Sequence, residues 1–396
     1  MKSVIRHKID LIAKCIYAKV RESIPDGFSG LYTGDFGILL FLFYYSRYSK
    51  DKKYISLTEA YAEILLDQIA KEPKSHTFCS GLAGILYLFE HLRENDFINI
   101  DISDVQSVLD KFLIHKMQND IQQRRYDFMH GALGVGLYFL KKKTNQEQIQ
   151  ELVDFLYATA EKNIDNKIFK WKSVINIEEN IVGYNIALSH GISSIILFLS
   201  RVVKSGMINE KISEMLSGAV NYVLSQQIDF RQYGSCFPSL SLENKNGSIF
   251  KSRLAWCYGD LGVSMSLWQA GKTTNNIEWK EKGLEVFLQS IQRLSLVENC
   301  VRDAGICHGS AGITMMYHRM CIETHRNEFK EATDYWLNQI INFSQFRDGL
   351  AGYKTSWGDE WKCDYSLLTG IAGIGLVLIS CLTEDSQIWD EMFLLS

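Results

Sequence analysis

One short pattern recurs seven times along this chain, and it constrains the fold more than any other feature. Each copy has a glycine, two residues and a second glycine, followed by a strongly apolar run, as in SGLAGILYLF and HGSAGITMMY. In the fourth copy Ser194 replaces the second glycine, which is expected to alter slightly how that helix starts. The first glycines, about fifty to seventy residues apart, are Gly34, Gly81, Gly131, Gly191, Gly259, Gly309 and Gly370. Such a long internal period is typical of a fold built from repeated units.

Each repeat holds two segments with different hydrophobic patterns. The segment after the glycines is apolar on all sides, which indicates a buried helix. Between the copies lie amphipathic segments, such as residues 54–72, 213–227 and 278–294, with apolar residues at helical spacing. Only three prolines interrupt 396 residues. The sequence therefore predicts an all-α fold, an α/α toroid of seven inner and seven outer helices. We expect one domain over residues 1–396, with long loops near 163–186 and 228–252.

Charge and hydropathy exclude several classes of protein. The formal net charge of −4 is too small to indicate a nucleic-acid partner or a membrane surface. The longest apolar runs, 36–45 and 371–380, are too short for a transmembrane segment, and the N-terminus lacks the apolar core of a signal peptide. Nine cysteines, an odd number, favour reduced thiols. We therefore expect a cytoplasmic protein whose thiols are free to bind a metal.

The residues just before the first glycine of each repeat carry the chemistry. Immediately before that glycine stand, in chain order, Thr33, Ser80, His130, His190, Tyr258, His308 and Thr369. One position earlier, Cys257 and Cys307 occupy the same place in successive repeats. Equivalent positions of adjacent repeats are neighbours in space, so Cys257, Cys307 and His308 are predicted to meet. Zinc prefers such ligands, and three protein ligands with one open position are typical of a catalytic zinc site.

Six of the seven other cysteines are interpreted as structural. Cys79 shares the repeat position of Cys257, but neither His nor Tyr follows it, and a free cysteine is usually a small buried hydrophobe. The same interpretation covers Cys15, Cys300, Cys321, Cys363 and Cys381. A zinc ion held by two thiolates is a mild Lewis acid, which suits keeping a substrate thiol deprotonated and nucleophilic near neutral pH. The ligand set therefore favours activation of a thiol for attack on carbon.

With these features the chain resembles the lanthionine synthetase C-like family. The resemblance rests on the seven repeats and on the motifs RLAWCYGDLG, ICHGSAG, LSHG and YDFMHG, and it covers essentially the whole chain. It implies an α/α toroid with one zinc ion, held by Cys257, Cys307 and His308 together with an exchangeable water. It also implies a zinc-dependent cyclase reaction, the Michael addition of a peptide cysteine to dehydroalanine or dehydrobutyrine, which closes a lanthionine or methyllanthionine thioether ring.

The same resemblance assigns catalytic roles to four further residues. His190 matches the histidine proposed as general acid or base, and Asp127 matches the aspartate that would orient or tune a histidine. Arg253 matches the arginine near the metal, where its charge could stabilise an enolate oxygen. Tyr258 matches the active-site tyrosine, as a secondary candidate. His130 shares the repeat position of His190, but the family does not require a histidine there.

Family membership would make the chain a stand-alone lantibiotic cyclase. The first repeat begins about thirty residues into the chain, which leaves no room for a fused dehydratase. We therefore expect a separate dehydratase to prepare the precursor peptide, leader and core, and a transporter to join a membrane-associated complex. A relative that adds glutathione to dehydroamino acids in damaged proteins, and a non-catalytic scaffold that binds the leader, stay open. The prenyltransferase β-subunit, another zinc-thiolate α/α barrel, lacks the paired C-Y-G and C-H-G motifs.

Overall fold

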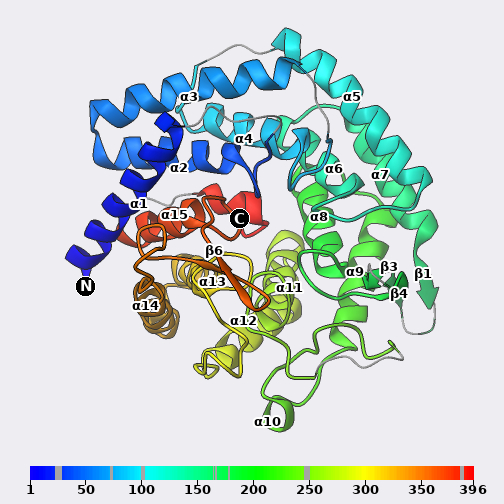
Figure 1. Ribbon diagram of the computed structural model, residues 1–396. Helices are drawn as coiled ribbons and strands as arrows, with labels where there is room; N and C mark the ends of the chain where they lie inside the picture. Colours follow the sequence, from blue (N-terminus) through cyan, green and yellow to red (C-terminus); the bar gives the residue numbers. More distant parts are fainter. Residues whose placement is uncertain are drawn as a thin grey trace. The chain divides into compact units, whose positions relative to one another are not determined.

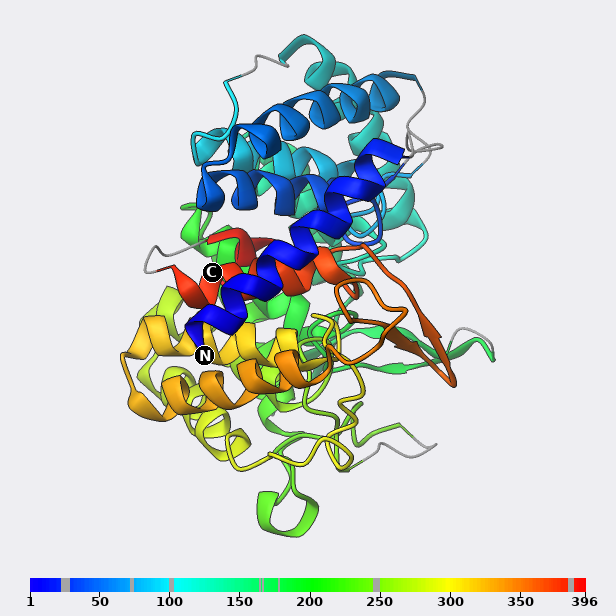
Figure 2. The same cartoon turned by 60° about the vertical axis from the view of Figure 1, so that its left-hand side comes forward.

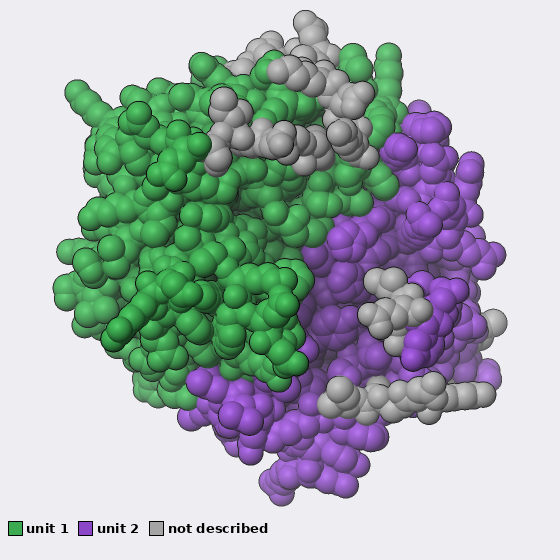
Figure 3. All heavy atoms as spheres, in the orientation of Figure 1, with its two compact units in different colours: residues 1–112, 301–393 green, residues 113–300, 394–396 purple. Residues whose placement is uncertain are grey.

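The chain is helical through most of the residues that its computed structural model describes. These residues are 1–22, 29–71, 75–99, 103–163, 165, 167–176, 179–244, 250–383 and 388–396. The chain divides into two compact units, residues 1–112 with 301–393 and residues 113–300 with 394–396 (Figure 3). Each unit contains its own share of the repeated helix pairs. That residues 1–396 form one domain stays a prediction.

The first unit contains the helices of repeats one, two, six and seven (Figure 1). Its apolar helices are α2 (Asp35–Ser49), α4 (Leu82–Glu94), α13 (Ser310–Thr324) and α15 (Ile371–Leu382). Its amphipathic helices are α1 (Lys2–Glu22), α3 (Lys52–Lys71), α14 (Asn327–Asn342) and the start of α5 (Ser103–Gln122). Helix α15 packs against α1, α2 and α13, and Figure 2 shows α1 crossing α15. Residue 72, included in the predicted helix over 54–72, lies outside the described residues.

The second unit contains the helices of repeats three, four and five. Its apolar helices are α6 (Ala132–Lys142), α8 (Ile192–Lys204) and α11 (Asp260–Thr274). Its amphipathic helices are α7 (Gln146–Thr159), α9 (Glu210–Leu224) and α12 (Ile277–Ser290), and α10 (Phe230–Tyr233) is a single turn. Helix α8 packs against α6, α9 and α11, and α12 packs against α11. The alternation of a buried and an amphipathic helix follows the sequence pattern in both units.

Short β-hairpins supplement the helices. Strands β1 (Glu161–Asn163) and β2 (Ile168–Lys170) pair antiparallel, as do β3 (Lys172–Asn176) with β4 (Ile181–Tyr184) and β5 (Thr355–Trp357) with β6 (Glu360–Lys362). Much of the loop expected near 163–186 is therefore strand. The β-branched pair Val174 and Val182 faces across the β3–β4 ladder, and such pairs stabilise a hairpin. In so short and half-exposed a hairpin, the alternation of apolar and polar residues is too weak to predict strands in a chain whose pattern is otherwise helical.

The inner helices begin where the glycines predict. Each one starts directly after the first glycine of its repeat, which serves as N-cap. The second glycine allows a close approach, because a Cβ on Gly312 would lie 1.9 Å from the carbonyl oxygen of Ile306. The expected effect of Ser194 on the helix start is wrong. Helix α8 begins after an extended Gly191, as five of the other six inner helices begin after an extended glycine. The Ser194 hydroxyl donates to the Gly191 carbonyl at 2.7 Å.

Backbone hydrogen bonds join the turns of neighbouring repeats at equivalent positions. In the first unit the Tyr32 N–H donates to the Cys79 carbonyl at 2.8 Å, and the Cys307 N–H donates to the Leu368 carbonyl at 3.0 Å. The Leu368 N–H in turn donates to the Tyr32 carbonyl at 2.9 Å, so the seventh repeat is bonded to the first. The residues two positions before the first glycine therefore lie side by side within this unit, as the repeat phase predicts.

One further prediction concerns membranes. Among the helices over the described ranges, none combines the length and the apolar character that a membrane span requires.

Candidate metal centre

Cys257 lies in the turn that precedes α11, and this turn is bonded to the one before α8. The Cys257 side chain is buried, with 5% of its surface exposed. Its carbonyl oxygen accepts hydrogen bonds from the backbone N–H of Ser189 at 3.2 Å and from the Ser189 hydroxyl at 3.3 Å. The backbone that carries this thiol is therefore fixed by the neighbouring repeat.

Cys307 and His308 lie in the turn that precedes α13, and both are half-buried. The buried carboxylate of Asp303 holds this turn together. One of its oxygens accepts from the Gly305 N–H at 2.9 Å, and the other accepts from the N–H of Ser356 in β5 at 3.0 Å. The β5–β6 hairpin therefore braces the turn through Asp303. Asp303 was not among the residues predicted from the sequence.

The three predicted ligands come together. One donor atom from each of Cys257, Cys307 and His308 lies within 4.8 Å of the other two. Over the described residues this is the one such group of three or more His, Cys, Asp or Glu side chains. A tetrahedral zinc ion, with bonds of about 2.3 Å to sulfur and about 2.0 Å to nitrogen, places its ligand atoms roughly 3.5–3.8 Å apart. The donor set of two thiols and one imidazole therefore fits zinc.

His190 and Asp127 form a hydrogen-bonded pair across two repeats. His190 precedes α8, Asp127 precedes α6, and His190 Nδ1 lies 2.8 Å from Asp127 Oδ2. The other carboxylate oxygen accepts from the backbone N–H of His130 at 2.8 Å. The His130 ring stacks on the His190 ring, with centroids 5.7 Å apart. Burial alone would lower the pKa of His190, but the hydrogen bond and charge of Asp127, together with Cys257, raise it above its ordinary value.

Tyr258 and Arg253 lie on the Cys257 turn. The amide of Asn185 donates from Nδ2 to the Tyr258 hydroxyl at 3.2 Å, and its Oδ1 accepts from the Ala187 N–H at 2.8 Å. Burial raises the pKa of Tyr258, so its hydroxyl keeps its proton at neutral pH. The Arg253 side chain is exposed, and its charge partly offsets that rise in the Tyr258 pKa.

Asn185 and Asp303 stand at the same place in their repeats, six residues before the first glycine. This shared polar position is the signal in the sequence that could have identified them. Ser75 and Asp364 also stand at that position in their repeats. The Asp364 carboxylate accepts from the Ser366 N–H at 2.7 Å, much as Asp303 accepts from Gly305. In these four repeats the side chain at this position accepts from a backbone N–H two residues on and closes the turn that leads into the inner helix.

The other cysteines follow the structural interpretation only in part. All nine cysteines carry free thiols, and Cys79 is buried as expected. Cys300 and Cys363 are exposed, so for them the interpretation as buried hydrophobes is wrong. Both lie outside the helices, Cys300 in the turn after α12 and Cys363 directly after β6, where no packed helix face covers a side chain. The other three, which are half-buried, are Cys15, Cys321 and Cys381.

Together, the fold and the candidate ligands define the class of protein. It is a helical-repeat protein with a candidate zinc centre of two cysteines and one histidine. The family model described as lanthionine synthetase C-like protein matches residues 27–394. The chain belongs to this family.

Two named proteins are similar to it. Nisin biosynthesis protein NisC of Lactococcus lactis subsp. lactis is 23% identical over 385 residues, which cover 91% of this chain and 87% of NisC. The solved structure of nisin cyclase matches with a TM-score of 0.76 at 20% identity, covering 100% of this chain and 98% of that one. The structural match confirms the predicted fold class, an α/α toroid.

Proposed function

We propose that this chain is a zinc-dependent lanthipeptide cyclase that closes thioether rings in a dehydrated peptide. The observation that carries this proposal is the group of Cys257, Cys307 and His308, whose donor atoms lie within 4.8 Å of one another. These residues would hold one zinc ion per chain and leave one position open. Such an ion supplies Lewis-acid activation, which lets a cysteine thiol lose its proton near neutral pH.

The protein's own acid is His190. Its Nδ1 donates to Asp127, because a carboxylate only accepts, so Nε2 is the nitrogen left to take up or deliver a proton. The raised pKa of His190 keeps more of its imidazole protonated at neutral pH than in a free histidine. In the reaction the peptide sulfur bonds to Cβ of the dehydroamino acid, the π electrons move toward Cα and its carbonyl, and His190 delivers a proton to Cα.

Three further residues would support this proton transfer. Asp127 fixes the orientation of the His190 imidazole and stabilises its protonated form. Tyr258 accepts a hydrogen bond from Asn185, which leaves its own O–H free to donate to the substrate. The exposed guanidinium of Arg253, on the same turn as Cys257, could bind the carbonyl oxygen that becomes negative as the thioether bond forms.

The substrate and partners follow from this chemistry. The substrate must carry both cysteine thiols and dehydrated serine or threonine residues, so it would be a precursor peptide, leader and core, that a separate dehydratase has treated. NisC is named for nisin biosynthesis, and this chain would take the equivalent step in the production of a related peptide. We place it in the cytoplasm, in contact with the dehydratase and a transporter.

Ring closure can be counted as lost thiols. Michael addition leaves the peptide mass unchanged, so each ring appears as one cysteine that no longer reacts with an alkylating agent. The purified protein is incubated with a dehydrated precursor, alkylated and analysed by mass spectrometry. We expect wild-type protein to close rings and Cys307→Ala to lose both zinc and activity. Cys79→Ala removes a thiol from the equivalent position of the second repeat and should keep both.

Several outcomes would contradict this proposal. Normal ring closure by Cys307→Ala, or wild-type protein that holds no zinc, would overturn the role of the metal. Addition of glutathione to a dehydrated peptide without cysteine, in the absence of ring closure on the precursor, would replace the cyclase with a glutathione-adding enzyme. Stoichiometric zinc without any thioether product would instead favour a scaffold that binds the leader peptide.

A further inference from the structure

A buried ion pair lies at the end of the turn that carries Cys257. Asp260, the first residue of α11, is fully buried, and its Oδ2 accepts from Nη1 of Arg293 at 2.8 Å. Its other oxygen accepts from the backbone N–H groups of Cys236 at 3.0 Å and Phe237 at 2.9 Å. The Arg293 side chain is also almost fully buried, with 3% exposed. This pair is not used in the proposed chemistry.

The guanidinium of Arg293 holds both ends of the segment 252–260. Besides Asp260 at its end, Arg293 bonds to the carbonyl of Ser252 at its beginning. Arg293 Nε also donates to Oδ1 of Asn299 at 3.0 Å, and the Asn299 carbonyl accepts from the Leu254 N–H at 3.2 Å. Cys257 lies between these anchor points. The ion pair therefore fixes the path of the backbone that presents this thiol.

This turn differs from the others in its backbone. Gly259 has φ of +85°, whereas the N-cap glycines of the other six repeats are extended. A Cβ at Gly259 would also lie 2.3 Å from the carbonyl oxygen of Arg253. Backbone in such a conformation persists only where its surroundings hold it. The buried pair supplies that support in the repeat that carries Cys257.

We propose that Asp260 and Arg293 are positioning residues for the metal centre, which fix the Cys257 turn so that the site binds zinc tightly. The inference rests on the proposed function, because it assumes that Cys257 is a zinc ligand. Groups that orient a metal ligand commonly change metal affinity by about 10–100-fold when they are removed. A loosened turn would present its thiol in many positions and lower the affinity in the same way.

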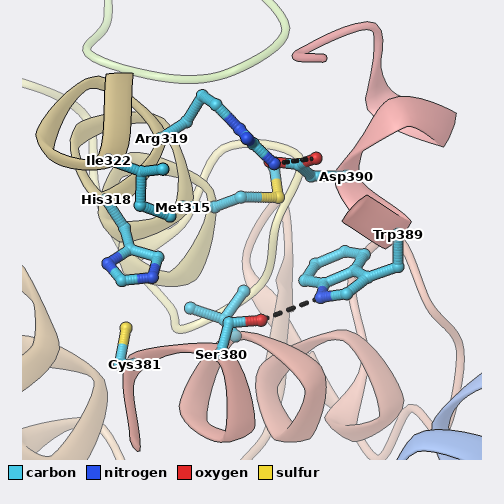
Figure 4. Close-up of a pocket in the computed structure, with 9 residues that line it drawn as sticks. Met315, His318, Arg319, Ile322, Ser380, Cys381, Trp389 and Asp390 are labelled. Carbon is cyan, nitrogen blue, oxygen red and sulfur yellow. Dashed lines mark hydrogen bonds and ion pairs between the residues drawn. The ribbon is translucent and has the colours of Figure 1, made fainter. Parts of the chain in front are cut away.

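A second buried Arg–Asp pair offers a matched control. Arg319 of α13 bonds to Asp390 of η1 (Ile388–Phe393) through two contacts of 2.7 and 2.6 Å, and both side chains are 7% exposed. Figure 4 shows this pair beside Trp389, which donates to Ser380. It lies about three helical turns beyond His308 along the chain. It therefore matches the first pair in chemistry and burial, but its two residues belong to the unit that does not contain Cys257.

The test compares Asp260→Asn with Asp390→Asn in the full chain. Zinc content is measured by elemental analysis, zinc affinity by competition with a chelator, and stability by thermal unfolding. We expect both variants to lose stability, and Asp260→Asn alone to bind zinc about 10–100-fold more weakly. Arg293→Lys keeps the charge but loses the forked geometry. It should show the same loss and decides the question if Asp260→Asn does not fold.

Two results would overturn the inference in different ways. If Asp260→Asn and Arg293→Lys bind zinc as tightly as Asp390→Asn, the ion pair only stabilises the fold, and the cyclase proposal stands. If wild-type protein itself holds no zinc, the proposed function fails, and the inference fails with it.

Discussion

The turns before α4 and α15 are called self-contained because of their side-chain hydrogen bonds, although their backbones bond to neighbouring repeats. In each, the residue before the first glycine is a hydroxyl side chain that bonds within its own turn. The Ser80 hydroxyl lies 3.2 Å from that of Thr77, and the Thr369 hydroxyl donates to Asp364 Oδ2 at 2.5 Å. These bonds stabilise the turn and engage the hydroxyl within it.

The turns before α8 and α11 occupy the same place in their repeats but direct the equivalent side chain elsewhere. His190 bonds to Asp127 of the preceding repeat, and Tyr258 accepts from Asn185 of the preceding repeat. A side chain that bonds across repeats is held by two turns at once and can keep another polar atom free. The comparison indicates that function depends on where the side chain before the glycine is bonded.

The largest effect should come from the histidine of this cross-repeat pair. His190→Ala removes the proposed proton donor, and general acid–base catalysis contributes about 10²–10⁴-fold to a rate. We therefore expect ring closure to slow by about that factor, with zinc content unchanged. The rate is measured as thiols lost with time on a dehydrated precursor, and zinc by elemental analysis.

The matched change in a self-contained turn is Thr369→Val. It removes the hydrogen bond to Asp364, which should lower the free energy of unfolding by about 1 kcal/mol, and leaves the rate within about twofold. Equal rate losses in the two variants would show that the turns differ in residue type but not in role.

A smaller effect, with a distinct pH signature, is expected from Asp127→Asn. Burial favours neutral His190, and the hydrogen bond and charge of Asp127 outweigh it. Without Asp127 the pKa of His190 should fall below its ordinary value. The rate at neutral pH should drop about tenfold, and the pH at which His190 loses its proton should move down. A pH–rate profile, with an NMR titration of the histidine, measures both.

The same pair makes stability depend on pH in a defined direction. The folded-state pKa of His190 is raised above the unfolded value near 6.5. Its contribution to stability is therefore fully present below that value and is lost as pH rises through the folded-state pKa. Asp127→Asn should cost more stability at pH 5.5 than at pH 9. Asp364→Asn, in a self-contained turn, should leave the pH–rate profile unmoved, and a shift there would contradict the comparison.

Much of this arrangement could be predicted from the sequence because it depends on position within the repeat. The first glycines of the seven repeats mark the starts of the inner helices, and the repeat phase predicts that Cys257, Cys307 and His308 meet. That His190 and Asp127 belong to the same site as these ligands stays a prediction from the family resemblance, and their hydrogen bond is a finding of the structure.

The remaining features depend on contacts between segments without a common period. The hydrogen-bond partner of Asp260 is Arg293, which follows α12 in the chain. The partner of Asp303 is Ser356, which lies in a hairpin that the helical pattern of the sequence did not predict. A single aspartate at a helix start reads equally well as a cap or a surface residue. The partner that makes it a buried brace lies tens of residues away and leaves no local signal.

The smallest expected effect tests the turn itself. Ser194→Gly would restore the repeat pattern beside His190, yet we expect it to destabilise the protein by about 0.5–1 kcal/mol. The serine adopts an ordinary helical conformation, and its hydroxyl donates to the Gly191 carbonyl at 2.7 Å. Glycine at this position would lose the hydrogen bond and would favour the helical conformation less. The reverse change, Gly373→Ala, places a Cβ 2.0 Å from the Leu367 carbonyl and should cost several times more. Thermal unfolding measures both. If Ser194→Gly instead raised stability, the second glycine would be required in every repeat, and the turn before α8 would be strained rather than relaxed.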